Sequence, residues 1–197
     1  MSQIKLKHSG GNSVIIAAPD SNPASDRTLK LPSNADGTVL TTTNPKSGNI
    51  IQVVNTQTGA MSTGTTTIPN DDTIPQITEG FEVMTRTITP TNASNTLLIQ
   101  VFCHISASVN SMPTTALFVG STADALASTF SHTFGLGAYP KVHNFTHKMT
   151  AGSTSELTFR VRTGMNNAGT VTFNGRDGSR MRGGSVASSI TIMEVAA

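Results

Sequence analysis

The sequence predicts an all-β protein in which a short N-terminal intertwined β segment precedes a β-sandwich domain of the jelly-roll kind. Three observations carry this prediction: Thr, Ser, Gly and Asn fill much of the chain, apolar and polar residues alternate in many short runs, and only one short run is typical of a helix. Thr and Val favour strands, whereas Gly, Asn and Pro favour turns. A length of 197 residues fits one sizeable domain with an appendage.

The N-terminal segment, residues 1–48, is a string of strand candidates of about four residues each, near the lower limit for strands. Ile4–Lys7 and Val14–Ala17 flank a Gly-rich turn, and Thr28–Leu31 and Val39–Thr41 flank a polar turn that contains Asp-Gly. Such a thin strip buries too little apolar surface to offset its conformational entropy. We therefore expect it to be stable only when intertwined with copies of itself or laid on a larger partner.

The apolar residues of this segment are the candidates for anchoring and for the subunit interface, because strand addition would pair them with neighbouring chains. They are Ile4, Leu6, Val14, Ile15, Leu29, Leu31, Val39 and Leu40.

A linker at 44–49 separates this segment from residues 49–197, which we predict to form the sandwich. The expected strands are Ile50–Thr58, Phe81–Thr89, Thr96–Ser106, Thr114–Val119, Val142–Met149, Glu156–Arg162, Val171–Asn174 and Ser188–Val195. Continuous apolar character in Leu97–Phe102 indicates a central strand covered on both faces. Thr122–Thr129 is expected to form one or two helical turns. Asn174-Gly175 and Asp177-Gly178 are expected to be tight turns.

Two parts of the chain resemble phage proteins. The run 27–40, Arg-Thr-Leu-x-Leu-Pro followed by Asp-Gly-Thr-Val-Leu, resembles a short unit of phage tail fibres and related virion proteins. The strand order after the linker, with its Gly80–Val83 opening and its closing strand near Ala197, resembles phage-fibre knobs and the trimeric jelly rolls of the C1q and tumour-necrosis-factor type. These resemblances imply a homotrimeric knob.

The composition limits the kinds of partner that the sequence predicts. A formal net charge of +2 is too small to predict a nucleic-acid partner, and no run is long enough for membrane insertion. The single cysteine, Cys103, allows no internal disulfide, which fits synthesis in a reducing cytosol such as that of a bacterial host.

No residue pattern predicts an enzyme. Cys103 and His104 are neighbours on a predicted strand, so their side chains point to opposite faces and cannot act as nucleophile and base. Adjacent Asp71 and Asp72 cannot flank a glycosidic bond from two directions. Phosphate loops, nucleophile elbows and dinucleotide fingerprints do not occur, and no cofactor is predicted.

Histidine and arginine provide two candidate sites. His143 and His147 share one face and could hold a metal, or could be polar residues on a sheet; a histidine on a trimer axis is a further possibility. The Gly-rich run that holds Arg176, Arg180 and Arg182 is either a loop that binds acidic sugars or carboxylates of a partner or receptor, or a solvated loop.

Three function classes remain. The favoured one is a non-enzymatic structural protein of the virion surface, a trimeric knob that decorates or cements the capsid, with the major capsid protein as its partner. The alternative is a short tail fibre, attached to a tail protein, whose knob recognises a host surface glycan or protein. The third is a carbohydrate-binding β-sandwich. Because only about forty residues precede the linker, a long fibre shaft does not fit there, which favours the capsid.

Overall fold

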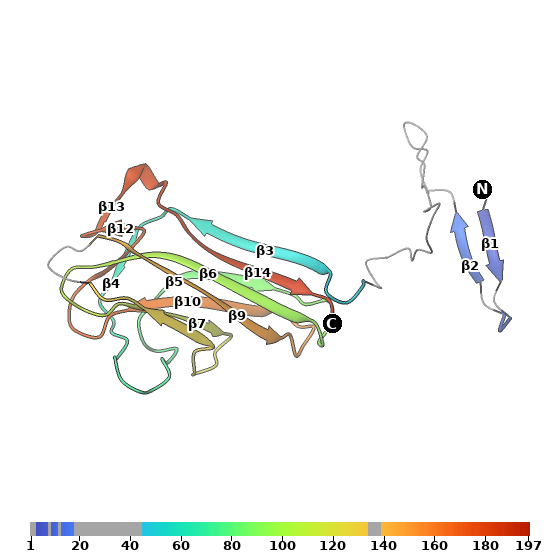
Figure 1. Cartoon of the computed structure of the whole chain (residues 1–197), viewed down its shortest axis with the longest axis horizontal. Coiled ribbons are helices and arrows are strands. Elements are labelled where there is room, and N and C mark those ends of the chain that lie inside the picture. Colours follow the sequence, from blue (N-terminus) through green and yellow to red (C-terminus); the bar gives the residue numbers. More distant parts are fainter. Residues whose placement is uncertain (1–2, 8, 12, 18–44, 134–138) are drawn as a thin grey trace. The chain divides into compact units, whose positions relative to one another are not determined.

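The computed structural model describes residues 3–7, 9–11, 13–17, 45–133 and 139–197. The chain divides into two compact units, Met1–Val39 and Leu40–Ala197, which are described separately (Figure 1). The predicted boundary at residues 48/49 falls after this division, and the first strand of the second unit begins at Ile50. Within the described residues, no helix is long and apolar enough to cross a membrane.

The first unit contains an antiparallel hairpin of β1 (Gln3–Lys7) and β2 (Ser13–Ala17). Its register pairs Ile4 with Ile16, Leu6 with Val14 and Lys5 with Ile15. The predicted strands at 4–7 and 14–17 are therefore confirmed. The second predicted pair, at 28–31 and 39–41, lies outside the described residues, together with Leu29, Leu31, Val39 and Leu40.

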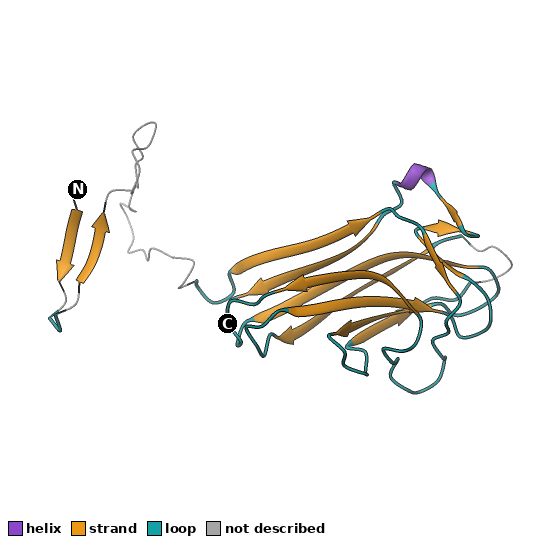
Figure 2. Cartoon of the chain, turned by 180° about the vertical axis from the view of Figure 1, so that it is seen from behind, coloured by secondary structure: helices purple, strands orange, loops and turns teal. Residues whose placement is uncertain are grey.

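The second unit is a sandwich of two antiparallel sheets, as Figure 2 shows from behind the view of Figure 1. The four-stranded sheet has the order β5 (Phe81–Ile88), β10 (Leu157–Gly164), β7 (Thr114–Val119), β8 (Ala127–Phe130). The six-stranded sheet has the order β3 (Ile50–Thr58), β14 (Ser188–Val195), β6 (Thr96–Ala107), β11 (Val171–Phe173), β4 (Ser62–Gly64), and β9 (Lys141–Thr150) pairs with the other side of β6. The predicted all-β sandwich is thus confirmed.

The core lies between the sheets, where every second residue of each strand points inward. In β6 the inward residues are Leu97, Ile99, Val101, Cys103 and Ile105, and none of them has exposed surface. Side chains of the facing sheet complete the core, among them Leu117, Phe159 and Val161. Burial of these side chains is the main term that stabilises the sandwich.

Two predictions about individual elements are wrong. β6 is central, but it is not covered on both faces, because burial alternates along it and Gln100 is exposed. The expected helix at 122–129 is absent: its second half forms β8, which pairs with β7. Helix propensity is a weak preference, and the unpaired edge of β7 offers ladder hydrogen bonds that override it.

A long loop, residues 65–80, covers the outer face of the four-stranded sheet. Ala116 and Phe118 pair with Arg162 and Arg160 on this outer face, yet both are fully buried. The guanidinium of Arg162 donates hydrogen bonds to the backbone oxygens of Glu79 (2.8 Å) and Gly80 (2.9 Å), which fixes the end of the loop on the sheet. These bonds attach the end of the loop to a side chain on the outer face of the sheet.

Candidate functional site

The N-terminal hairpin holds the described members of the predicted anchor. Its register joins Leu6 to Val14 and Ile4 to Ile16, whereas Ile15 pairs with Lys5. The side chain of Leu6 is 58% exposed. A two-stranded hairpin of five residues a strand is marginally stable in water, so this unit has few contacts of its own to hold it.

The Arg-rich run forms a small hairpin of β12 (Gly175–Arg176) and β13 (Ser179–Arg180), followed by the 3₁₀ turn η1 (Arg182–Gly184). Asp177 and Gly178 join the two strands with φ values of 50° and 71°, so the predicted tight turn is confirmed at this pair. Two hydrogen bonds hold the hairpin on the six-stranded sheet: the Ser106 hydroxyl donates to the Gly175 oxygen over 2.9 Å, and the Asn174 N–H donates to the His104 oxygen over 3.0 Å.

The hairpin register separates the three arginines. Arg176 pairs with Ser179 and Arg180 pairs with Gly175, so their side chains leave opposite faces of the hairpin. Arg180 lies beside Gly184, where an added Cβ would be 3.3 Å from the Arg180 Cδ. Arg182 is exposed and has a positive φ of 52°. The three arginines, which lie close together in the sequence, therefore do not point toward one common site.

One of the three arginines instead meets an aromatic residue. The guanidinium of Arg176 lies 4.2 Å from the centroid of the Tyr139 ring, and its Nε is 3.2 Å from Asp177 Oδ2. Tyr139 is 67% exposed, so the stacked pair presents a flat, partly cationic surface to solvent. Sequence reasoning missed this pair, because residues 37 positions apart meet only through the fold.

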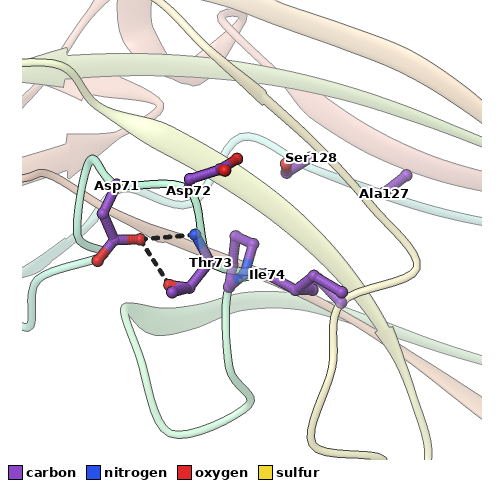
Figure 3. Close-up of a pocket in the computed structure, with 8 residues that line it drawn as sticks. Asp71, Asp72, Thr73, Ile74, Ala127 and Ser128 are labelled. Atoms are coloured by element: carbon purple, nitrogen blue, oxygen red, sulfur yellow. Dashed lines mark hydrogen bonds between the residues drawn. The ribbon is translucent and has the colours of Figure 1, made fainter.

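A pocket of about 270 Å³ lies where the 65–80 loop meets the start of β8 (Figure 3). Its lining consists of Asp71, Asp72, Thr73, Ile74, Pro75, Ala125, Ala127 and Ser128. Asp71 accepts hydrogen bonds from the Thr73 backbone N–H (2.9 Å) and hydroxyl (2.5 Å), and these bonds lower the pKa of the Asp71 carboxyl. Asp71 thus shapes the loop. No hydrogen bond or ion pair within the described part of the chain engages the Asp72 carboxylate.

The Cys103 and His104 side chains lie on opposite faces of β6, as predicted. Cys103 is fully buried and burial raises the pKa of its thiol to about 12, whereas His104 is half-buried on the outer face. Desolvation lowers the pKa of His104. Because the thiol stays protonated and the two groups face apart, this pair cannot perform nucleophilic chemistry.

The two spaced histidines differ in their surroundings. His143 is buried between the sheets, where its Nδ1 lies 2.7 Å from Thr115 Oγ1 and its Nε2 lies 2.9 Å from Ser131 Oγ. Desolvation lowers the pKa of His143 to about 4 and also lowers the pKa of the half-buried His147. The interpretation of both as polar residues on one side of a strand is therefore confirmed, and the structure adds that His143 is buried. Among the described residues, no three His, Cys, Asp or Glu side chains gather as a metal site.

A buried carboxylate at the end of β14 is fully satisfied by neutral donors. Glu194 accepts hydrogen bonds from Asn95 Nδ2 (2.6 Å), Gln52 Nε2 (2.6 Å) and both the N–H and the hydroxyl of Thr91 (2.8 Å each). Burial raises the pKa of this carboxyl, but the hydrogen bonds outweigh burial and hold the pKa below its ordinary value. Glu194 therefore fastens the closing strand to the 88–95 loop, and its role is structural.

Comparison with known proteins gives no family. No protein-family model and no curated protein matches the chain. Among solved structures, Eiger TNF from S. frugiperda is similar over 73% of this chain and 93% of its own, with a TM-score of 0.41 and 11% identity. The CBM22-1 xylan-binding domain from Paenibacillus barcinonensis Xyn10C is similar over 77% of this chain and 98% of its own (TM-score 0.37, 10% identity).

The structure of the infectious bursal disease virus Gt strain covers 95% of this chain and 48% of its own, with a TM-score of 0.35 and 14% identity. All three TM-scores lie below 0.5, so none of these likenesses assigns a function or a residue role to the chain.

Proposed function

We propose that this chain is a non-enzymatic structural protein of a phage virion surface, a homotrimeric knob attached by its N-terminal β segment, and that it decorates or cements the capsid. The observation that carries the proposal is the N-terminal hairpin, a unit separate from the sandwich whose register joins Ile4 to Ile16 and Leu6 to Val14. An isolated hairpin of this size is marginal in water. It gains stability when a partner strand or surface covers it, which is the property of an anchor.

The length of chain between hairpin and sandwich limits how far the sandwich can lie from an N-terminal attachment point. Residues 18–49 join β2 to β3. At about 3.3 Å per residue, this segment spans on the order of 100 Å when fully extended. A segment of this length has no room for a shaft of many repeats between the two units. This limit excludes a long shaft only between the hairpin and the sandwich.

The outer face of the six-stranded sheet supports self-association. Across β3, β14, β6 and β9 the register places rows of neutral side chains side by side, and Lys148 is the charged residue among them. The rows are Val53, Met193, Leu98, Lys148; Asn55, Thr191, Gln100, Thr146; and Gln57, Ser189, Phe102, Asn144. We call this the neutral face.

Neutrality matters because each residue near a threefold axis meets its own copies, and like charges there would repel. The outer face of the four-stranded sheet is different, since Glu82, Arg160 and Arg162 form ion pairs on it. We therefore place the trimer contact on the neutral face.

A charge introduced on the neutral face tests this contact. Thr191→Glu would bring three carboxylates together, and we expect light scattering to show a shift from trimer to monomer. Thr158→Glu, on the outer face of the four-stranded sheet, is the matched control and should stay trimeric. A wild-type monomer at micromolar concentration would refute the trimer itself, whereas a trimeric Thr191→Glu variant would refute only the choice of face.

Deletion of residues 1–48 tests the anchor. We expect the truncated protein to fold as the sandwich, with unchanged far-ultraviolet circular dichroism, and to lose co-sedimentation with phage particles that lack the native protein. Normal decoration of the particles by the truncated protein would show that the anchor proposal is wrong.

A second candidate function is a receptor-binding knob, and the stacked Tyr139–Arg176 pair favours it. An exposed aromatic ring backed by a guanidinium suits a ligand with a flat face and a negative group. Soluble knob should then block adsorption of the phage to its host, and Tyr139→Ala should abolish the block. Unimpaired adsorption in the presence of saturating knob would exclude this function.

A further inference from the structure

The pocket at the meeting of the 65–80 loop and β8 lies apart from the Arg-rich hairpin, because it belongs to the layer over the four-stranded sheet and the hairpin belongs to the six-stranded sheet (Figure 1). Its walls come from two segments about fifty residues apart, 71–75 and 125–128. The proposed anchor and trimer assign no role to it.

Backbone hydrogen bonds hold the two walls together. The Ala125 N–H donates to the Pro75 oxygen over 2.9 Å, and the Ile77 N–H donates to the Ala123 oxygen over 2.8 Å. The side chain of Gln76 adds a bond from Nε2 to Asp124 Oδ1 at 2.9 Å. These bonds build the pocket in the free protein, so a ligand need not pay the entropy of ordering the loop.

Polar groups converge on the pocket from both walls. Figure 3 shows the Asp72 carboxylate and the Ser128 hydroxyl pointing toward one another across the hollow. Neither side chain has a hydrogen-bond partner among the described residues, whereas Asp71 is engaged by Thr73. The free polar groups are therefore one strong acceptor and one hydroxyl that can donate or accept.

Apolar groups complete the lining. Ile74 is 53% exposed, and Pro75, Ala125 and Ala127 are half-buried beside it. This surface is aliphatic, and none of the eight lining residues is basic or aromatic. The chemistry excludes anions, which the two carboxylates repel. Among the described residues, no three His, Cys, Asp or Glu side chains gather here as a metal site.

We infer that the pocket binds a neutral sugar residue of a polysaccharide. The hydroxyls of a hexose would donate to the Asp72 carboxylate and exchange a hydrogen bond with Ser128, while the C–H face of the ring lies on Ile74 and Pro75. A volume of about 270 Å³, just below the range of about 300–1,000 Å³ that is typical of ligand sites, suits a single sugar ring. The site selects against acidic sugars because their carboxylate would face Asp71 and Asp72.

The test uses the full chain and saturation-transfer NMR with glucose, galactose, mannose and N-acetylglucosamine, followed by titration of whichever binds. We expect at least one neutral sugar to bind in the millimolar range and glucuronate to bind more weakly. Asp72→Ala and Ser128→Ala should each weaken binding by roughly tenfold, as the loss of a hydrogen bond to a charged or hydroxyl group predicts. Both residues are exposed, so the variants should fold normally.

Asp177→Ala is the matched control, since it removes an exposed aspartate from the distant hairpin and should leave sugar affinity unchanged. Three results would overturn the inference: no neutral sugar binds at millimolar concentration, Asp72→Ala leaves affinity intact, or glucosamine binds while every neutral sugar fails. The last result would identify an amine site. None of them bears on the anchor or the trimer, whose tests are separate.

Discussion

Acid should destabilise the sandwich through His143, which bridges the two sheets by hydrogen bonds to Thr115 on β7 and to Ser131 after β8. Each ring nitrogen of the neutral imidazole thus has a hydroxyl partner, and a hydroxyl can donate to one nitrogen or accept from the other. Protonation of the ring would place a charge in a buried site. The folded protein therefore holds His143 neutral.

The magnitude follows from the two pKa values. Burial lowers the pKa of His143 to about 4, whereas in the unfolded chain it is near 6.5. Between these values the unfolded chain binds a proton that the folded chain does not, so the free energy of unfolding falls as the pH decreases. At about 1.4 kcal/mol per pKa unit, this one group removes on the order of 3 kcal/mol between pH 7 and pH 4.

The assay is urea unfolding at a series of pH values for the wild type and for His143→Gln, which keeps hydrogen-bonding groups at the site but does not titrate. We expect the variant to be less stable than the wild type at pH 7 and to lose about 3 kcal/mol less on acidification. The lowered pKa values of His104 and His147 act in the same direction, but they are common to both proteins and cancel in the difference. Equal pH dependence in the two proteins would refute the reasoning.

Three further substitutions or probes test the packing. Glu194→Gln should lower the free energy of unfolding by about 1–3 kcal/mol at pH 7, because an amide NH₂ would face donors that now bond to a carboxylate; an unchanged urea midpoint would contradict this. Gly80→Ala should lower the free energy of unfolding by roughly 1–3 kcal/mol, since the φ of Gly80 is +61° and the new Cβ would lie 2.6 Å from the Thr163 oxygen. Gly152→Ala is the control and should lower it less, because Gly152 has a similar φ of +71° but lies in open space. Equal shifts of the melting temperature in the two variants would argue against the close approach at Gly80. Cys103 should react with a thiol reagent only after unfolding, because it is fully buried and its pKa is raised to about 12; rapid labelling of the folded protein would contradict that burial.

The strands of the sandwich could be predicted from sequence because their periodicity reflects burial. The predicted Ile50–Thr58, Thr114–Val119 and Ser188–Val195 coincide with β3, β7 and β14, and the ends of the other predicted strands lie within two residues of those in the structure. Alternation reports which side chains reach the core, so it fixes a strand even without its partners. The sequence pattern was misleading at Leu97–Phe102. Its continuous apolar character indicated a strand covered on both faces, but Gln100 is exposed in the structure.

Two strands, β4 and β8, were not predicted, because pairing with a neighbouring strand holds them and their own sequences show no strand pattern. β8 exists because the edge of β7 is open to it, and β4 exists because it pairs with β11. The pocket likewise depends on the register that joins Pro75 to Ala125, which no local pattern encodes. The arginine cluster was visible in the sequence, but a two-residue turn sends Arg176 and Arg180 to opposite faces, and only the fold brings Arg176 to Tyr139.

Labelling of intact particles tests the central claim most directly. Gold-conjugated antibody raised against residues 49–197 would be imaged on purified phage by electron microscopy, with particles that carry the 1–48 deletion as the comparison. We expect label distributed over the capsid of wild-type particles and absent from the deletion particles. Label confined to the tail, or retained on capsids after the deletion, would contradict the account of a capsid knob held by its N-terminal β segment.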